Sequence, residues 1–107
     1  MNKTLSLMGL ARKAGKLSIG HDTVFAAVRN STAKAVLLTS DASPRHAREL
    51  EAAEFDGNIT VLDADMDEAG RALGKRSCIF SVDDSGFAAA IEKTTRRTQN
   101  GSKVQDT

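Results

Sequence analysis

The sequence predicts an α/β protein, a three-layer α/β/α sandwich with a central mixed, mostly parallel sheet. Apolar runs of strand length alternate with longer segments in which apolar residues recur at helical spacing. Glycine, proline and helix-capping residues separate one segment from the next. Strands that alternate with helices at short intervals imply right-handed crossovers, so we expect the sheet in the middle and helices on both of its faces.

The first half of the chain predicts two helices and two strands. Helical spacing of apolar residues indicates a helix over residues 4–14, which Gly15 ends. Alternation of apolar and polar residues indicates a short strand around residues 17–19, and helical spacing returns over residues 21–30. The continuous apolar run at residues 35–38 suits a strand that is covered on both faces.

The second half of the chain repeats this alternation. Ser43 and Pro44 indicate a helix start, because serine caps a helix and proline fits its first turn. We expect that helix to end near residues 56–57. The remaining elements are a strand at residues 59–62, a helix at residues 66–73 that Gly74 ends, a strand at residues 78–82 and a last helix that Asp84 and Ser85 begin.

Length and composition predict one domain and a tail. A chain of 107 residues with 40% hydrophobic content can build one core without a metal or a disulfide. Residues 1–95 therefore form the expected single domain. Residues 96–107 contain one apolar residue, too little to offset the entropy of ordering them, so we expect a disordered tail there.

Charge is distributed unevenly along the chain, although the net charge is only +1. Residues 1–48 hold eight Lys or Arg against two acids, and residues 49–73 hold one Arg against eight acids. This division predicts one cationic and one anionic face, which would orient a nucleic acid rather than coat it.

Cysteine and apolar content exclude several classes of protein. The single Cys78 excludes an internal disulfide, and no pair of Cys or His residues has zinc-ligand spacing. No apolar stretch is long enough for a signal peptide or a membrane span. We therefore expect a cytoplasmic monomer with no metal, no cofactor and no membrane contact.

The segment from residue 9 to residue 22 predicts a surface that holds a polyanion. It joins a basic helix end, a glycine stop, a short strand and a new helix start. The first amides of that new helix lack internal acceptors and face outward as donors. Structured RNA is the partner that we expect. The candidate contacts are Arg12, Lys13 and Lys16 for phosphate and Gly20, His21 and Asp22 for base edges, although each also has an ordinary role as a turn, a helix start or a solvated charge.

Two other modes of nucleotide recognition are disfavoured. With four Phe and no Trp or Tyr, the chain lacks the aromatic surface on which single-stranded bases stack. Five residues rather than four separate Gly9 from Gly15, and Leu17 stands where a phosphate-binding loop needs Ser or Thr for magnesium. Contacts with phosphates and base edges remain.

Two other function classes stay open. A protein-interaction module would dock a basic partner, such as a ribosomal protein, on the acidic stretch over residues 49–68. An enzyme would use Asp41, at the end of a strand, or His21 and His46 as acid and base. No nucleophile pattern accompanies these residues, so catalysis ranks last and we expect no catalytic residue.

The order of short strings along the chain resembles a known family. The strings are residues 7–11, 16–22, 34–38, 40–44 and 69–74. They resemble the kink-turn-binding ribosomal protein family of the seven-Ae and thirty-e type, and especially its bacterial YlxQ-like members. The resemblance covers nearly all of residues 5–92. It implies an α/β/α domain that binds RNA without catalysis, and it adds ribosomal RNA and ribosomal proteins as expected partners.

The resemblance also implies how RNA is held. The family places the start of its second helix against paired purines beside a sharp bend, with a small residue, Asn and Glu there and Lys three positions later. The corresponding residues here are Gly20, His21, Asp22 and Phe25. His can donate or accept as Asn does, and Asp can accept from a guanine edge, but Phe25 cannot reach a phosphate as an ammonium would.

A second contact loop of the family aligns with residues 74–77. Its cations, Lys75 and Arg76, could partly replace the missing lysine by contacting phosphate. The resemblance therefore implies two RNA contacts, one at the start of the second helix and one in this loop.

Overall fold

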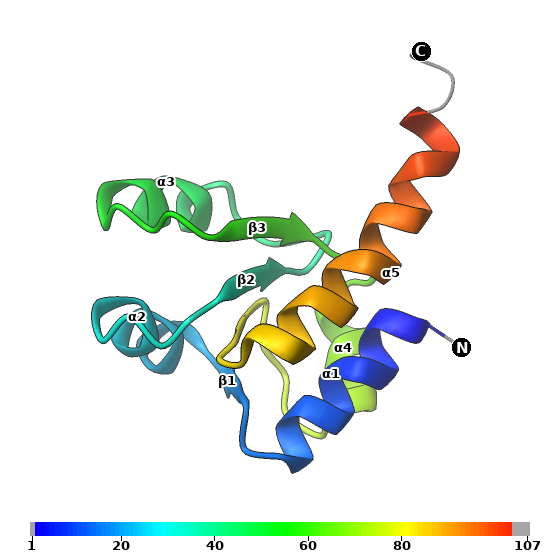
Figure 1. The fold of residues 1–107 in the computed structure, drawn as a ribbon, viewed down its shortest axis with the longest axis horizontal. Helices are drawn as coiled ribbons and strands as arrows, with labels where there is room; N and C mark the ends of the chain where they lie inside the picture. Colours follow the sequence, from blue (N-terminus) through cyan, green and yellow to red (C-terminus); the bar gives the residue numbers. More distant parts are fainter. Residues whose placement is uncertain (1, 104–107) are drawn as a thin grey trace.

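The computed structural model describes the backbone of residues 2–103 and the side chains of residues 2–95. Five helices and four strands alternate over this range (Figure 1). They are α1 (Lys3–Lys13), β1 (Leu17–Ile19), α2 (His21–Arg29), β2 (Ala35–Leu38), α3 (Arg45–Ala52), β3 (Asn58–Val61), α4 (Met66–Leu73), β4 (Ile79–Val82) and α5 (Ser85–Lys103).

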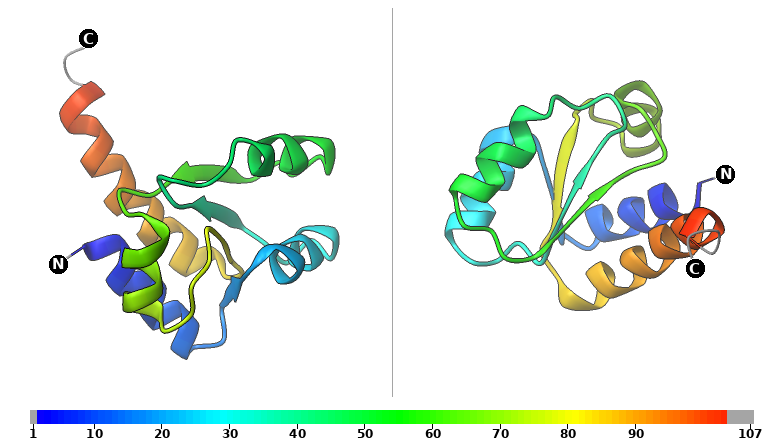
Figure 2. Two further views of the ribbon diagram at one scale, coloured as in Figure 1. Left: turned by 180° about the vertical axis from the view of Figure 1, so that it is seen from behind. Right: turned by 90° about the horizontal axis from the view of Figure 1, so that it is seen from above.

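The sheet separates two layers of helices, as predicted. Helices α2 and α3 lie on one face, and α1, α4 and α5 lie on the other (Figure 2). A buried cluster that includes Val24, Leu50 and Ile79 fills the first interface. A larger cluster that includes Met8 and Phe80 fills the second. The α/β/α sandwich is confirmed.

The sheet is mixed, but it is not mostly parallel. Its strand order is β1-β4-β2-β3, and only β2 and β3 pair in parallel. Val61, which ends β3, and Ile79, which begins β4, both pair with Leu38. Helix α4 and its flanking loops therefore leave and re-enter the sheet at one edge, so β4 must run against its neighbours.

Two further predictions concern the end of α3 and the tail over residues 96–107. Helix α3 ends at Ala52, several residues before the predicted end. Helix α5 continues to Lys103, which places part of the predicted tail over residues 96–107 within a helical segment, and residues 104–107 lie outside the described residues. None of the helices over residues 2–103 has the length and apolar content that crossing a membrane requires.

Candidate nucleic-acid interface

One edge of the sheet brings together the two segments that were predicted to contact RNA. Ile19 of β1 pairs with Phe80 of β4, and the amide of Gly20 donates to the carbonyl of Ile79 at 3.1 Å. The start of α2 therefore lies directly beside the start of β4. Residues 74–78, which lead from α4 into β4, end at this same place.

Helix α2 begins with an open first turn. Its first internal hydrogen bond runs from the amide of Val24 to the carbonyl of Gly20 at 2.9 Å, so the amides of residues 21–23 have no acceptor within the helix. No side chain among the described residues caps this end. Gly20 has φ 101° and ψ 155°, a conformation that is essentially restricted to glycine. The fully exposed Asp22 is the acidic residue of the first turn, where the helix dipole favours it.

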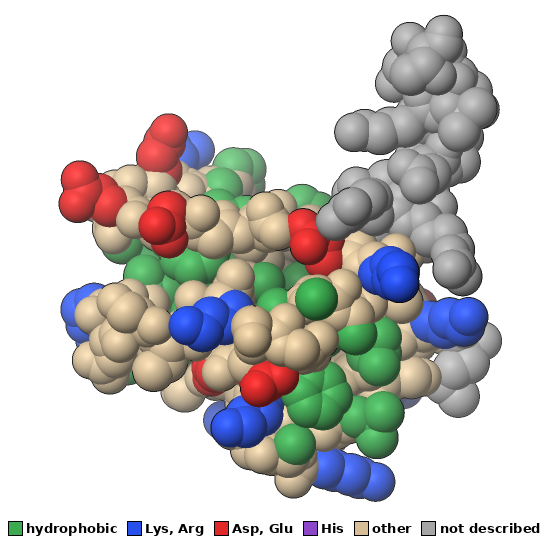
Figure 3. All heavy atoms as spheres, in the orientation of Figure 1, with side chains coloured by type: hydrophobic (Ala, Val, Ile, Leu, Met, Phe, Trp, Pro, Cys, Tyr) green, Lys and Arg blue, Asp and Glu red, His purple; other side chains and the backbone are tan. Residues whose placement is uncertain are grey.

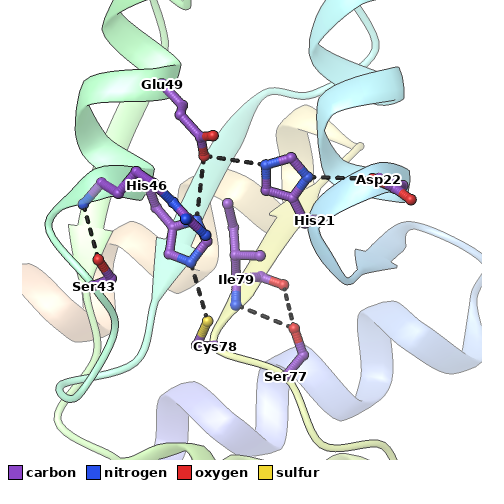
Figure 4. A network of polar contacts seen from close by, with 9 residues as sticks. His21, Asp22, Ser43, His46, Glu49, Ser77, Cys78 and Ile79 are labelled. Carbon is purple, nitrogen blue, oxygen red and sulfur yellow. Dashed lines mark hydrogen bonds and ion pairs between the residues drawn. The ribbon is translucent and has the colours of Figure 1, made fainter.

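His21 is held in place by three neighbours, of which Figure 4 shows Asp22 and Glu49. Its ring lies 4.6 Å, centroid to centroid, from the ring of Phe25. Its Nδ1 is 3.3 Å from Oδ1 of Asp22, and its Nε2 is 3.1 Å from Oε1 of Glu49 on α3. The hydrogen bonds to Asp22 and then to Glu49 raise the pKa of His21 above its usual value, because both carboxylates stabilise the protonated ring.

Phe25 lies in the hydrophobic core rather than on the surface. It is 8% exposed and belongs to the core between α2, α3 and the sheet. Its ring packs against the ring of His21. The residue that replaces the family's lysine therefore does not reach the surface where a phosphate would lie.

Arg12 joins the end of α1 to the end of α4. Its Nη1 donates to the carbonyl of Leu73, the last residue of α4. The same nitrogen lies where a Cβ at Gly74 would be only 3.0 Å away. Arg12 is thereby placed next to the loop that carries Lys75, and the exposed Lys13 follows it in the chain.

The two cations of the loop differ in their surroundings. Arg76 is paired with Asp67 of α4, with Nη2 and Nε at 2.8 Å and 2.9 Å from Oδ1. Lys75 is exposed and has no ion-pair partner among residues 2–95. Lys75 is therefore the freer of the two, because Arg76 must share or leave a carboxylate to contact phosphate.

Lys16 lies beside the end of α1, where its amide donates to the carbonyl of Ala11 at 2.8 Å, and away from the start of α2. It precedes β1, and its carbonyl accepts from the amide of Asp83 beyond the end of β4 at 2.8 Å. Leu17 pairs with Val82, so this is the opposite edge of the sheet from Gly20. Four residues of extended chain separate Lys16 from Gly20 by about 13 Å. Lys16 is therefore close to the end of α1 and remote from the start of α2, and its contact with phosphate stays a prediction.

Asp41, which was weighed as a reactive group, stabilises a junction. Its Oδ1 accepts from Oγ1 of the buried Thr39 at 2.7 Å and from the amide of Met66 at 3.1 Å. These hydrogen bonds, that of Thr39 above all, hold the pKa of Asp41 below its usual value, against an opposing effect of burial. The contact with Met66 ties the loop after β2 to the start of α4.

Sequence reasoning missed a cluster beside His21. His46, which was weighed only as an acid or base, is 6% exposed, and its Nδ1 lies 3.6 Å from Oε1 of Glu49. Its Nε2 lies 3.3 Å from Sγ of Cys78. The available signal was the spacing of three between His46 and Glu49, which puts both on one face of a helix.

Comparisons with known proteins identify the family. The profile described as "Ribosomal protein L7Ae/L30e/S12e/Gadd45 family" matches residues 2–92. The RNA-binding protein YlxQ of Enterococcus faecium is 31% identical over 87 residues, which are 80% of this chain and 84% of that protein. The large ribosomal subunit protein eL30 of Oryza sativa subsp. japonica is 33% identical over 89 residues, with 79% and 80% covered.

The fold agrees with a solved structure as well. A protein with unknown function from Bacillus halodurans superposes with a TM-score of 0.81 at 30% identity, over 90% of this chain and 99% of that chain. The resemblance that the short strings predicted, including the likeness to YlxQ, is confirmed. The chain belongs to the ribosomal protein L7Ae/L30e/S12e/Gadd45 family.

Proposed function

We propose that the protein binds structured RNA, without catalysis, at the sheet edge where α2 and β4 begin. We call this surface the RNA rim and define it by the residues Arg12, Lys13, Gly20, His21, Asp22, Gly74, Lys75 and Arg76. The observation that carries the proposal is the open first turn of α2 beside the start of β4, to which the loop with the exposed Lys75 leads. Its relatives include an RNA-binding protein and a ribosomal protein, which supports the proposal.

The open turn supplies two kinds of contact with RNA. The free amides of residues 21–23 and the dipole of α2 attract a phosphate or a base acceptor. The exposed carboxylate of Asp22 accepts hydrogen bonds from the amino group of guanine. Recognition by base edges and backbone requires bases that are presented by a bent or folded RNA, so a kink-turn-like RNA within ribosomal RNA is the target that we propose.

The charges around the rim orient the RNA. Lys75, Arg12 and Lys13 lie on the α4 side of the start of α2, whereas Glu49 lies on its α3 side. Figure 3 shows Asp and Glu side chains gathered over α3 and several Lys and Arg side chains over the opposite half of this view. Phosphates are therefore expected along the side of α4, and repulsion by the acidic side would keep them away from α3.

RNA titration tests the proposal. Binding of the full chain to a kink-turn RNA, a plain duplex and a single strand is measured at two salt concentrations. Tighter binding of the kink-turn RNA is expected, because of the three RNAs only the bent one holds accessible base edges in a fixed position for Asp22. Equal, weak and steeply salt-dependent binding to all three RNAs would indicate a nonspecific cationic surface. Absence of binding would favour the alternative, a module that docks a basic protein on residues 49–68.

A double variant tests the loop. Changing Lys75 and Arg76 together to Ala should make the plot of log K against log salt concentration less steep. The slope should fall by up to about 2, near one unit for each lost phosphate contact. Lys34→Ala is the matched control, because Lys34 is exposed and precedes β2 at the opposite edge of the sheet. An unchanged salt slope in the double variant would exclude the loop as a phosphate contact.

We further propose that the protein is a cytoplasmic monomer and that it works with ribosomal components.

A further inference from the structure

Three side chains with nitrogen or oxygen atoms that could bind a metal ion lie close together between the start of α2 and helix α3. His21, His46 and Glu49 each offer one ligand atom, and these three atoms all lie within 4.8 Å of one another. Figure 4 shows the two rings and the carboxylate pointing toward one another from the two helices. His21 is half exposed and His46 is buried, so the cluster is closed on its protein side and open on its solvent side.

The fold explains why these residues meet. His46 and Glu49 are three residues apart on α3 and therefore project from the same face. Leu50 of α3 and Phe25 of α2 share one buried core, which fixes the two helices side by side. Phe25 also supports the ring of His21, so the third ligand is held without any contribution from a flexible loop.

His46 carries the observation that points to a missing partner. Its side chain is 8% exposed, and its Nδ1 is a buried polar atom with no hydrogen-bond partner among the residues whose side chains are described. Burying an unpaired polar atom is unfavourable, and such atoms in native proteins usually have an ion or water as partner. Nδ1 faces Glu49 at 3.6 Å, which is beyond hydrogen-bond distance but is the spacing of two ligands on one ion.

The other nitrogen of His46 is already occupied. Its Nε2 lies 3.3 Å from Sγ of Cys78, just before β4. An N–H at Nε2 that donates to sulfur leaves the lone pair of the ring on Nδ1, directed at the cluster. Metal-bound histidines commonly donate their second ring nitrogen to a neighbouring acceptor in this way.

The spacings fit a tetrahedral ion. Bonds of about 2.0–2.1 Å from zinc to nitrogen or oxygen place tetrahedral ligands about 3.4 Å apart. The observed distances are 3.1 Å between His21 and Glu49 and 3.6 Å between His46 and Glu49. Two imidazoles and one carboxylate also form a donor set that binds zinc with a fourth position left to water.

We propose that His21, His46 and Glu49 form a site for a divalent transition-metal ion, of which zinc fits best, with Cys78 as the positioning partner of His46. The fourth position faces solvent beside the open turn of α2. The site joins α2 to α3 through the ion, and it goes beyond the RNA-binding proposal without depending on it. Without an ion, the two rings would contact Glu49 only through ion pairs or hydrogen bonds.

Zinc titration of the full chain, free of any histidine tag, tests the site. Competition with a chromophoric chelator at neutral pH should give one zinc ion per chain. Glu49→Gln and His21→Asn should each weaken binding at least about tenfold, since loss of a direct ligand costs no less than loss of a residue behind it. Glu51→Gln on the same helix is the matched control, because Glu51 is exposed and outside the cluster, and it should bind as the unchanged protein does.

Nitrogen-15 spectra of the imidazole rings locate the ion independently of any variant. Zinc should shift Nε2 of His21 and Nδ1 of His46 while Nε2 of His46 keeps its proton. The site is excluded if these two nitrogens do not respond to zinc. It is equally excluded if the unchanged protein binds zinc no more tightly than Glu49→Gln does, which would leave the cluster as ion pairs alone.

Discussion

Helices α2 and α4 both begin at the same edge of the sheet, but their first turns differ. Asp65 caps α4 by accepting from the amide of Glu68 at 2.9 Å, and the Glu68 carboxylate accepts from the amide of Asp65 at 3.2 Å. Asp41 accepts from the amide of Met66 as well. Helix α2 is preceded by Gly20, which has no side chain with which to cap it. One helix start is closed by the protein and the other is left open.

The difference shows where this fold keeps its binding capacity. A capping box contributes to stability by occupying donors, so the start of α4 has little left for a ligand. The start of α2 leaves its donors to solvent and gives up that stabilisation. It is also the place of the His21–Glu49 contact and of the proposed metal site. Incomplete local hydrogen bonding distinguishes the proposed functional edge better than charge does.

Replacing Gly20 should have the largest effect, because it breaks the open start of α2. Gly20→Ala forces a residue with a Cβ into φ 101° and should lower the free energy of unfolding by about 1–3 kcal/mol. Space is not the cause, since, apart from the two chain neighbours, no atom of the described residues lies within 4 Å of the position of a Cβ at Gly20. Urea unfolding measures the change. Gly9→Ala, inside α1 and equally free of clashes, should instead raise stability by about 0.5–1 kcal/mol.

If Gly20→Ala were neutral, the backbone at the start of α2 would have to differ from the one described. If both glycine variants were destabilising by similar amounts, the explanation by φ would fail. The pair therefore separates the conformation of Gly20 from general sensitivity to alanine.

Removing the cap of α4 should have the next largest effect, and it should act on stability alone. Asp65→Ala leaves the amide of Glu68 without its side-chain acceptor and should cost about 1 kcal/mol. RNA affinity should be unchanged at fixed salt, because the cap belongs to the closed helix start. Urea unfolding and RNA titration of the same variant measure the two quantities. A clear loss of RNA affinity in folded protein would show that the start of α4 contributes to RNA binding as well as to stability.

Much of the fold could be predicted because it depends on local pattern. The nine elements follow from apolar spacing, and Gly15, Gly20 and Gly74 mark boundaries that the structure reproduces with positive φ. The direction of β4 could not be predicted, because spacing within a segment carries no information on which edge of the sheet the chain re-enters. Val61 and Ile79 meet the same residue of β2, and only the folded chain reveals this.

The candidate site could be predicted only in its contiguous part. Gly20, His21 and Asp22 are neighbours in sequence, so their common position at a helix start was predictable. Lys16 is only four residues from Gly20, yet a strand carries it to the other edge. His21 and Glu49 are 28 residues apart, and their contact depends on how two helices pack over one core. Closeness in sequence therefore does not guarantee closeness in the fold, and side chains that come together from separate elements cannot be recognised from their spacing.

The smallest expected effect concerns Asp41, which helps to close the start of α4. Because the folded state lowers the pKa of Asp41 from its usual 3.8, its ionised form stabilises the fold above that pH, and the contribution is lost as pH falls through the folded pKa. Asp41→Asn keeps an oxygen that can accept from Thr39 and Met66 but loses the charge. The variant should therefore unfold at a slightly lower urea concentration at pH 7, and the difference should shrink below about pH 4. Asp56→Asn, at an exposed position, is the control. A difference that persists unchanged to pH 2 would show that the charge of Asp41 contributes nothing, and that hydrogen-bond geometry alone closes α4 while α2 stays open.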